Sequence, residues 1–310
     1  MTSVDCSIAL LDKPTGVTSH DVVFGARRRL SELAQLEGGE RRRVKTGHAG
    51  TLDPFATGLL VLLVGRATRL QQYLLHQPKT YKAVARLGWT SDSGDRDGEL
   101  THTANVPADP RLSTGVLSLP VPAYSAIRVD GERLYAKARR GEEFEPPVRE
   151  MTVYRADRMD LDGERATFEI DCAGGTYVRS VVATLKDAYC EELVRTHVGP
   201  LSLEDAVSPD SLTLKDLVDP LDALAHLPAQ ALSDDDARAL LHGRRLAFEE
   251  TMLSELPAAS RQRTEDSADS ADRPIRLVSA GRLLGVGRVY DGRLKAETIL
   301  AGSLEELHAR

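Results

Sequence analysis

The sequence contains few cysteines, and they lie far apart. Cys6, Cys172 and Cys190 are the only three, and no two of them form a Cys-x-x-Cys pair. This spacing argues against a disulfide framework and against a structural zinc site. We therefore expect three reduced thiols.

Long apolar runs are missing as well. No run approaches the ~18 residues that a membrane span needs. The beginning of the chain includes Asp5, Asp12 and Lys13 and lacks the apolar segment of a signal peptide. With 310 residues, the chain is long enough for one large domain and a small one. We expect a cytoplasmic protein that does not bind membranes.

Negative charge predominates overall but not in the first third of the chain. The formal net charge is −7, whereas residues 1–90 contain 13 Lys or Arg and only 7 Asp or Glu. Arginines occupy positions 27–29 and 41–43, and Lys45 follows the second cluster. Such clusters are typical of phosphate contacts with a nucleic acid. A solvated helix face and a polar loop explain them equally well.

The most distinctive stretch follows these arginines. Residues 47–58 read GHAGTLDPFATG, and their glycines and proline break any helical or alternating period, which predicts an ordered loop. Pro54 biases the backbone of Asp53 to an extended conformation. The apolar run LLVLLV at 59–64 predicts a strand buried on both faces, which is a rigid support for a reactive carboxylate. Turn capping is the commoner role of an aspartate in such a loop, and propensity alone does not decide between the two.

This stretch resembles the signature of the TruB family of tRNA pseudouridine synthases. The resemblance extends, in the family's order, to LDKPTGVTSH at 11–20, KTYK at 79–82, YSA at 124–126 and GTYVR at 175–179. Together these segments span residues 8–205. The sequence departs from the family at 108–122, which is shorter and lacks a glutamine, at Arg128, where lysine is usual, and after Tyr189, where the chain is shortened. These departures concern RNA contacts more than the chemistry.

The resemblance implies an α+β pseudouridine synthase fold, with a mixed β-sheet flanked by helices and a small C-terminal PUA-like β domain. It implies isomerisation of uridine 55 in the T-arm stem-loop of tRNA, which requires no cofactor and no metal. We expect a monomer whose partner is tRNA. The implied roles belong to five residues: Asp53 is the catalytic nucleophile or base, Arg179 pairs with it, Tyr81 stacks on the uracil, His48 fills the space of the flipped nucleotide, and Leu193 lines the uracil pocket.

Without the resemblance, two of these residues could equally have purely structural roles. Tyr81 begins the apolar face of an alternating strand at 79–88, where core tyrosines are frequent. Arg179 lies in the first turn of a predicted helix and off its apolar stripe. A solvated arginine is common, but a cation at a helix start gains nothing from the macrodipole, which indicates an anionic partner.

Three other classes of function compete with this interpretation. No segment matches the GxxxxGK[ST] phosphate loop. A glycoside hydrolase needs two carboxylates flanking the bond, and the motif supplies one, with Asp92, Asp95 and Asp97 the nearest others in sequence. A non-catalytic tRNA-binding or tRNA-folding protein, which uses the basic first third and the β domain, is the strongest competitor. It predicts that Asp53 is dispensable.

Periodicity and turn residues predict the remaining elements. We expect a strand at 7–11, a helix at 21–36 capped by Thr18 or Ser19, a short helix at 66–75, a helix at 132–140, a hairpin of 151–159 with 164–172, a helix beginning at 173–176, a linker at 206–230, a helix at 237–242 and short strands within 275–300. The predicted domains are a catalytic domain at 1–230 and a PUA-like RNA-binding domain at 231–310. A loop at about 258–274 is expected to be disordered, because it lacks large apolar residues.

Overall fold

The computed structural model describes residues 4–36, 43–125, 127–129, 132–134, 140, 142, 144–249 and 273–309. The loop expected to be disordered lies almost entirely outside these residues, and so does most of the helix predicted at 132–140. Where that helix was predicted to begin, the prediction is wrong, because β9 (Glu132–Arg133) pairs as a strand with β8 (Arg128–Val129). No helix in the described ranges is long and apolar enough to cross a membrane.

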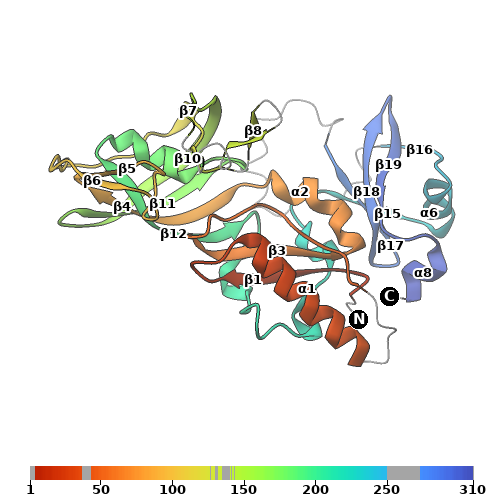
Figure 1. Cartoon of the computed structure of the whole chain (residues 1–310). Coiled ribbons are helices and arrows are strands. Elements are labelled where there is room, and N and C mark those ends of the chain that lie inside the picture. Colours follow the sequence, from red (N-terminus) through yellow and green to blue (C-terminus); the bar gives the residue numbers. More distant parts are fainter. Residues whose placement is uncertain are drawn as a thin grey trace.

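A mixed ten-stranded sheet forms the centre of the protein (Figure 1). Its strands follow the order β14-β1-β3-β12-β4-β11-β10-β7, with β2 added to β3 and β13 added to β12. Only β3 and β12 pair in parallel. The bounds are β1 (Cys6–Lys13), β2 (Thr46–His48), β3 (Thr57–Gly65), β4 (Lys79–Leu87), β7 (Gly115–Pro120), β10 (Val148–Asp162), β11 (Arg165–Cys172), β12 (Ala188–Val198), β13 (Leu201–Ser202) and β14 (Leu217–Val218). A separate hairpin consists of β5 (Trp89–Ser91) and β6 (Leu100–His102).

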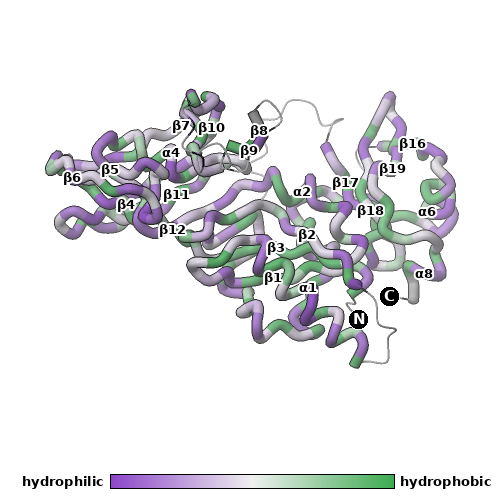
Figure 2. Tube along the Cα trace, viewed as in Figure 1, coloured by the Kyte–Doolittle hydropathy of each residue, from purple (hydrophilic) through white to green (hydrophobic). Residues whose placement is uncertain are grey.

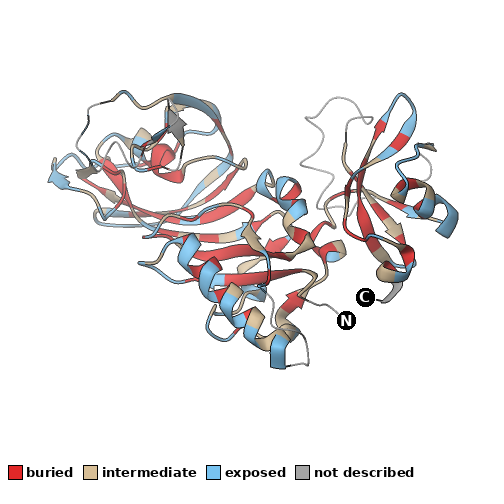
Figure 3. Cartoon of the chain, turned by 45° about the vertical axis from the view of Figure 1, so that its right-hand side comes forward, coloured by how far each residue is buried: buried red, intermediate tan, exposed pale blue. Residues whose placement is uncertain are grey.

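Strand β3 confirms the prediction of a strand buried on both faces. Residues 59–64 are all fully buried, and alternate side chains enter two different apolar cores. Leu60, Leu62 and Val64 meet helix α1 (Ser19–Leu36) through its buried stripe of Val22, Val23, Ala26 and Leu30. Figure 2 shows the apolar character of β1 and β3, and Figure 3 shows their burial at the centre of the molecule. The loop that carries Asp53 therefore enters the most buried strand of the sheet.

The short elements next to this core also agree with the sequence. Thr18 and Asp21 form the expected reciprocal cap of α1, with Thr18 N to Asp21 Oδ2 at 3.0 Å and Asp21 N to Thr18 Oγ1 at 3.1 Å. The helix predicted at 66–75 consists of η1 (Arg66–Leu70) and α2 (Gln71–Leu75). The hairpin of β10 and β11 lies where it was predicted. The helix predicted to begin at 173–176 begins later, as α4 (Val178–Val182), and is followed by η2 (Ala183–Leu185). The cysteines are free.

The motif's last glycine, Gly58, lies where β3 passes closest to β12. Its φ is +97°, and a Cβ placed there would lie 2.4 Å from the carbonyl oxygen of Arg195. We expect Gly58→Ala to lower the free energy of unfolding by about 3 kcal/mol or more, because backbone strain and a clash with another backbone add together. Gly115→Ala is the matched control, since Gly115 has a φ of +94° with open space around the Cβ position. Its expected cost is about 1–2 kcal/mol. Equal losses in urea denaturation would show that close packing against β12 is unimportant.

The C-terminal part forms a second, five-stranded sheet in the order β15-β17-β18-β19-β16. It contains β15 (Ala229–Leu232), β16 (Leu246–Ala247), β17 (Ile275–Ser279), β18 (Arg282–Tyr290), β19 (Arg293–Ile299), α6 (Asp234–Leu241) and α8 (Leu304–Ala309). Short strands lie within 275–300 as predicted, with breaks at 280–281 and 291–292, and Ser233 caps α6. Since β15 pairs with β17, this sheet begins just before residue 231.

The prediction of a linker at 206–230 is wrong. This segment packs on the main sheet, because Leu212 and Leu217 are buried beside α1 and β14 pairs with β1. It also contains η4 (Leu214–Asp216) and α5 (Pro220–Ala223), and η3 (Leu203–Asp205) precedes it. The sequence shows proline breaks here, but apolar residues that are spaced irregularly still fill a core formed by other elements.

The two sheets share one apolar core, so the C-terminal domain is docked on the main sheet. Leu283, Val286 and Leu300 belong to the same cluster as residues of β1 and β3. The Tyr73 hydroxyl lies 3.1 Å from that of Thr298. This contact and the shared core fix the C-terminal sheet beside α2.

Candidate active site

The loop between β2 and β3 is held by the last residue of β1 and the first residue of α1. The Lys13 ammonium is fully buried and donates to the carbonyl oxygens of Pro54 at 3.2 Å and Ala56 at 2.7 Å. The Ser19 hydroxyl accepts from Leu52 N at 2.8 Å and donates to Leu52 O at 2.9 Å. Lys13 and Ser19, which are distant in sequence from the loop, therefore fix its backbone on both sides of Asp53.

A second buried cation supports the same loop from β12. Arg195 is only 1% exposed, and its guanidinium donates to the carbonyl oxygens of Leu59 at 2.7 Å and Gly50 at 3.1 Å. A third, longer contact reaches Thr51 O at 3.4 Å. Because a buried guanidinium is stable only when its donors are satisfied, Arg195 and the loop hold each other in one geometry.

Arg179 is paired with Asp53, as the resemblance to the family implied. Its position at a helix start had indicated only that its partner is an anion. Arg179 Nε lies 3.0 Å from Asp53 Oδ2, and the arginine side chain is only 2% exposed. Its other nitrogens are bound to Asp95 Oδ2 at 3.0 Å, to Ser93 O at 2.9 Å and to Tyr124 O at 3.0 Å. The guanidinium cannot rotate without losing several of these bonds, so it presents one fixed edge to Asp53.

Asp53 combines a buried environment with access from outside. Burial raises the pKa of its carboxyl, while Arg179 and, less strongly, Lys13 lower it and Asp95 raises it. The Asp53 side chain is 30% exposed, whereas that of Asp95 is 8% exposed. Asp53 is therefore the carboxylate of this cluster that a ligand can reach.

An apolar surface adjoins Asp53. Tyr81 on β4 and Leu193 on β12 are each 6% exposed and pack in one cluster with Leu52, Phe55 and Val178. Burial raises the pKa of the Tyr81 phenol, and Arg195 and Asp53 both act on it. The site thus places a neutral aromatic ring and an aliphatic side chain next to a charged pair.

His48 lies at the end of β2, so the first residues of the motif are a strand and not the predicted loop. Burial lowers the pKa of its imidazole, and the nearby charges of Arg195 and His20 lower it further. The lowered pKa favours the neutral form of the ring.

Four of the five residues assigned from the sequence gather around the loop: Asp53, Arg179, Tyr81 and Leu193. His48 lies on the same loop's incoming strand. The sequence did not single out Lys13, Asp95 or Arg195, nor Tyr177, whose pKa is affected by Asp53 and Arg179. Lys13 and Tyr177 lie in quoted motifs, and Asp95 was named only as a possible second carboxylate of a glycoside hydrolase. The burial of Lys13 and Asp95 depends on distant residues.

Solved structures with this arrangement of sheets identify the class of fold. The chain aligns with one described as "Crystal Structure of a Cbf5-Nop10-Gar1 Complex", at a TM-score of 0.67 and 20% identity, covering 98% of this chain and 88% of that one. A second, "Structure of H/ACA RNP bound to a substrate RNA containing 2'-deoxyuridine", aligns at a TM-score of 0.65 and 20% identity, covering 96% and 86%. The protein has the fold of the pseudouridine synthases, and the prediction of an α+β fold with a C-terminal β domain is confirmed.

Sequence comparison then gives the family. The model of the "TruB family pseudouridylate synthase (N terminal domain)" matches residues 39–178. The "tRNA pseudouridine synthase B" of Azoarcus sp. (strain BH72) is 35% identical, covering 95% of this chain and 94% of its own. The protein of the same name from Thermobifida fusca (strain YX) is 39% identical, covering 77% and 86%. The chain belongs to the TruB family.

Proposed function

We propose that this protein is a tRNA pseudouridine synthase that isomerises uridine 55 in the T arm. The observation that carries the proposal is the ion pair between Asp53 and Arg179, in which the carboxylate is reachable and the cation is buried and fixed. The names of the relatives, which act on tRNA, support the substrate class. The resemblance of the motif supports position 55.

The reaction explains why one carboxylate is enough. Isomerisation breaks the bond between N1 of uracil and C1′ of ribose and forms a bond from C5 to the same carbon. The proton lost from C5 balances the one gained at N1, so no atoms are added and no electrons are exchanged with a cofactor. The reaction needs an ionised carboxylate beside the sugar, and Arg179 favours that form because a nearby opposite charge lowers the pKa of an acid.

The neighbouring residues then have distinct roles in this proposal. Tyr81 stacks on the uracil and Leu193 lines the uracil pocket, which holds the base while it is detached. The target uridine is buried in folded RNA and reaches Asp53 by base flipping. His48, with its neutral ring, occupies the vacated place in the RNA. A monomeric, cytoplasmic protein with a catalytic domain at 1–230 and an RNA-binding domain at 231–310 completes the proposal.

The geometry does not favour glycoside hydrolysis. That reaction needs two carboxylates that flank the scissile bond. Asp95 lies on the far side of the Arg179 guanidinium and is nearly buried, so it faces the arginine and not a substrate.

The test is incubation of the purified protein with an unmodified tRNA transcript, followed by mapping of pseudouridine. We expect one modified position, at nucleotide 55, and none in a transcript with cytidine at that position. Modification elsewhere would refute the assignment of position, and absence of any product would refute the activity.

A further inference from the structure

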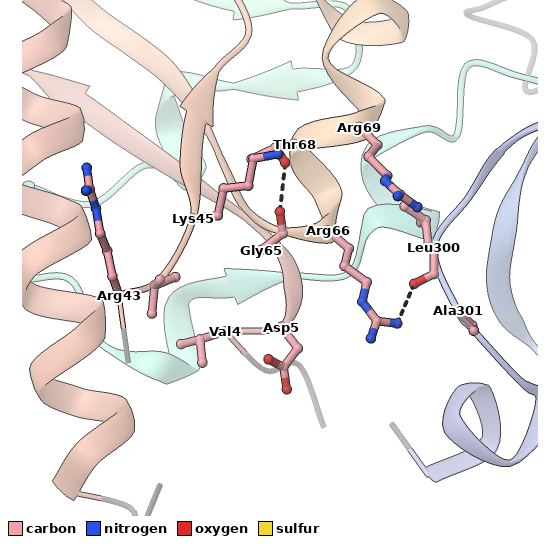
Figure 4. Close-up of a pocket in the computed structure, with 12 residues that line it drawn as sticks. Val4, Asp5, Arg43, Lys45, Gly65, Arg66, Thr68, Arg69, Leu300 and Ala301 are labelled. Atoms are coloured by element: carbon pink, nitrogen blue, oxygen red, sulfur yellow. Dashed lines mark hydrogen bonds between the residues drawn. The ribbon is translucent and has the colours of Figure 1, made fainter. Parts of the chain in front are cut away.

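A pocket of about 540 Å³ lies away from Asp53, between the main sheet and the C-terminal domain. Figure 4 shows its two walls. Arg43 and Lys45 come from the segment that leads into β2, and Arg66 and Arg69 come from η1, next to Leu300 of the C-terminal domain. The pocket is therefore a site that exists only where the two domains meet.

Positive charge predominates in the lining of this interdomain pocket. Four of the lining side chains are cations, and Asp5 is the one carboxylate among the described residues that line it. Arg66 is partly engaged, since it pairs with Glu306 and donates to Leu300 O at 2.9 Å. Arg69 donates to Ile299 O at 2.8 Å. These two arginines hold the C-terminal domain and still leave the pocket positive.

Arg43 and Lys45, unlike Arg66 and Arg69, do not hold the C-terminal domain through their side chains. Both are exposed, and neither side chain has a hydrogen bond or ion pair with another residue in the described part of the chain. Figure 4 shows the Lys45 ammonium turned toward Thr68 on η1, whereas the Arg43 guanidinium points away from Arg66 and Arg69. Lys45 and the two arginines of η1 form an arrangement suited to an anion with several acceptor oxygens, and Arg43 adds positive charge to the lining. Phosphate is the anion that fits this description.

We propose that the interdomain pocket binds a phosphate group, and that this group belongs to the backbone of the bound RNA at a distance from the target uridine. The RNA assignment rests on the function proposed above. Strand β3 leads from Thr57, beside the Asp53 loop, to Gly65, which lines the pocket. Nine residues of strand span about 26 Å, so the pocket lies roughly this far from the start of β3. A stem that leaves the flipped nucleotide and runs over the protein surface in the same direction as β3, which is itself buried, covers this distance to the pocket.

The test compares the salt dependence of tRNA affinity in two double variants. Arg43→Gln/Lys45→Gln removes the two unengaged charges without touching the contacts to the C-terminal domain. Lys82→Gln/Lys215→Gln is the matched control, because both lysines are exposed and lie outside the pocket, and neither side chain forms a hydrogen bond or ion pair within the part of the chain that the structure describes. The same net charge is thereby removed from a different surface.

We expect the slope of log affinity against log salt to flatten by about 0.7–0.9 in the pocket variant, and its affinity at 0.1 M salt to fall roughly five- to eightfold. The control should keep the wild-type slope. An unchanged slope in the pocket variant, or an equal change in the control, would overturn the proposal.

A calorimetric titration with inorganic phosphate separates the two sources of the anion. Loss of phosphate binding in the pocket variant together with the flatter slope supports the RNA phosphate. Loss of phosphate binding with an unchanged slope would show that the pocket binds the free ion, which contradicts the RNA assignment. Wild-type protein that binds tRNA but makes no pseudouridine would refute the proposed function, while the slopes would still decide the role of the pocket.

Discussion

Asp53→Asn is expected to reduce uridine isomerisation by on the order of 10⁴-fold or more, as the loss of a reacting group does in other enzymes. The amide keeps the size of the side chain but lacks the negative charge that the chemistry requires. The fold should survive, because Arg179 keeps its bonds to Asp95, Ser93 and Tyr124. Product formation in single turnover and thermal unfolding are the measurements.

Asp97→Asn is the matched control for this change. Asp97 is an exposed carboxylate close in sequence to the site, and its side chain is not part of the Arg179 cluster. The same substitution there should leave turnover at the wild-type level. A comparable loss in both variants would show that the effect is not specific to the carboxylate beside Arg179.

The pH dependence should change in opposite directions when the two partners of the cluster are altered. The ionised form of Asp53 is the active one, so activity falls as the pH drops through its pKa. Arg179 lowers that pKa and Asp95 raises it. Arg179→Gln should therefore move the acid limb of the kcat/KM profile to higher pH, and Asp95→Asn should move it to lower pH.

Arg179→Gln should in addition lower turnover by about 10²–10³-fold, the loss typical of removing a preorganised charge. The profile of kcat/KM reports the free enzyme, so it is the quantity to compare with the structure. Movement of both acid limbs in the same direction would mean that the limb belongs to another group.

The sequence predicted those elements whose pattern is local. Examples are the apolar run at 59–64, the reciprocal cap of Thr18 and Asp21, and the hairpin of β10 with β11. Each is determined by residues that lie within the element or next to it in sequence. The linker and the start of the helix predicted at 132–140 were wrong for the opposite reason. Leu212 and Leu217 are buried by α1, and β9 is a strand because β8 is its partner.

The candidate site divides in the same way. Asp53 could be identified because it lies in a distinctive twelve-residue motif. Arg179 could be identified because it lies at the start of a predicted helix. Lys13, Asp95 and Arg195 could not, because each is a buried charged residue whose partners are supplied by other segments. Lys13 and Arg195 are satisfied by backbone carbonyls of the Asp53 loop. Every residue has a backbone carbonyl group, so the sequence does not indicate which ones accept these hydrogen bonds. Only the folded structure shows these contacts.

The most direct test of the catalytic role of Asp53 measures tRNA affinity and pseudouridine formation on the same preparations of wild type and Asp53→Asn. We predict that the variant binds tRNA within a few-fold of wild type, since most affinity comes from phosphate contacts, while it forms no detectable product in a single turnover. Product formed by Asp53→Asn at the wild-type rate would contradict this role. Tight binding by the wild type without any product would instead indicate a non-catalytic tRNA-binding protein.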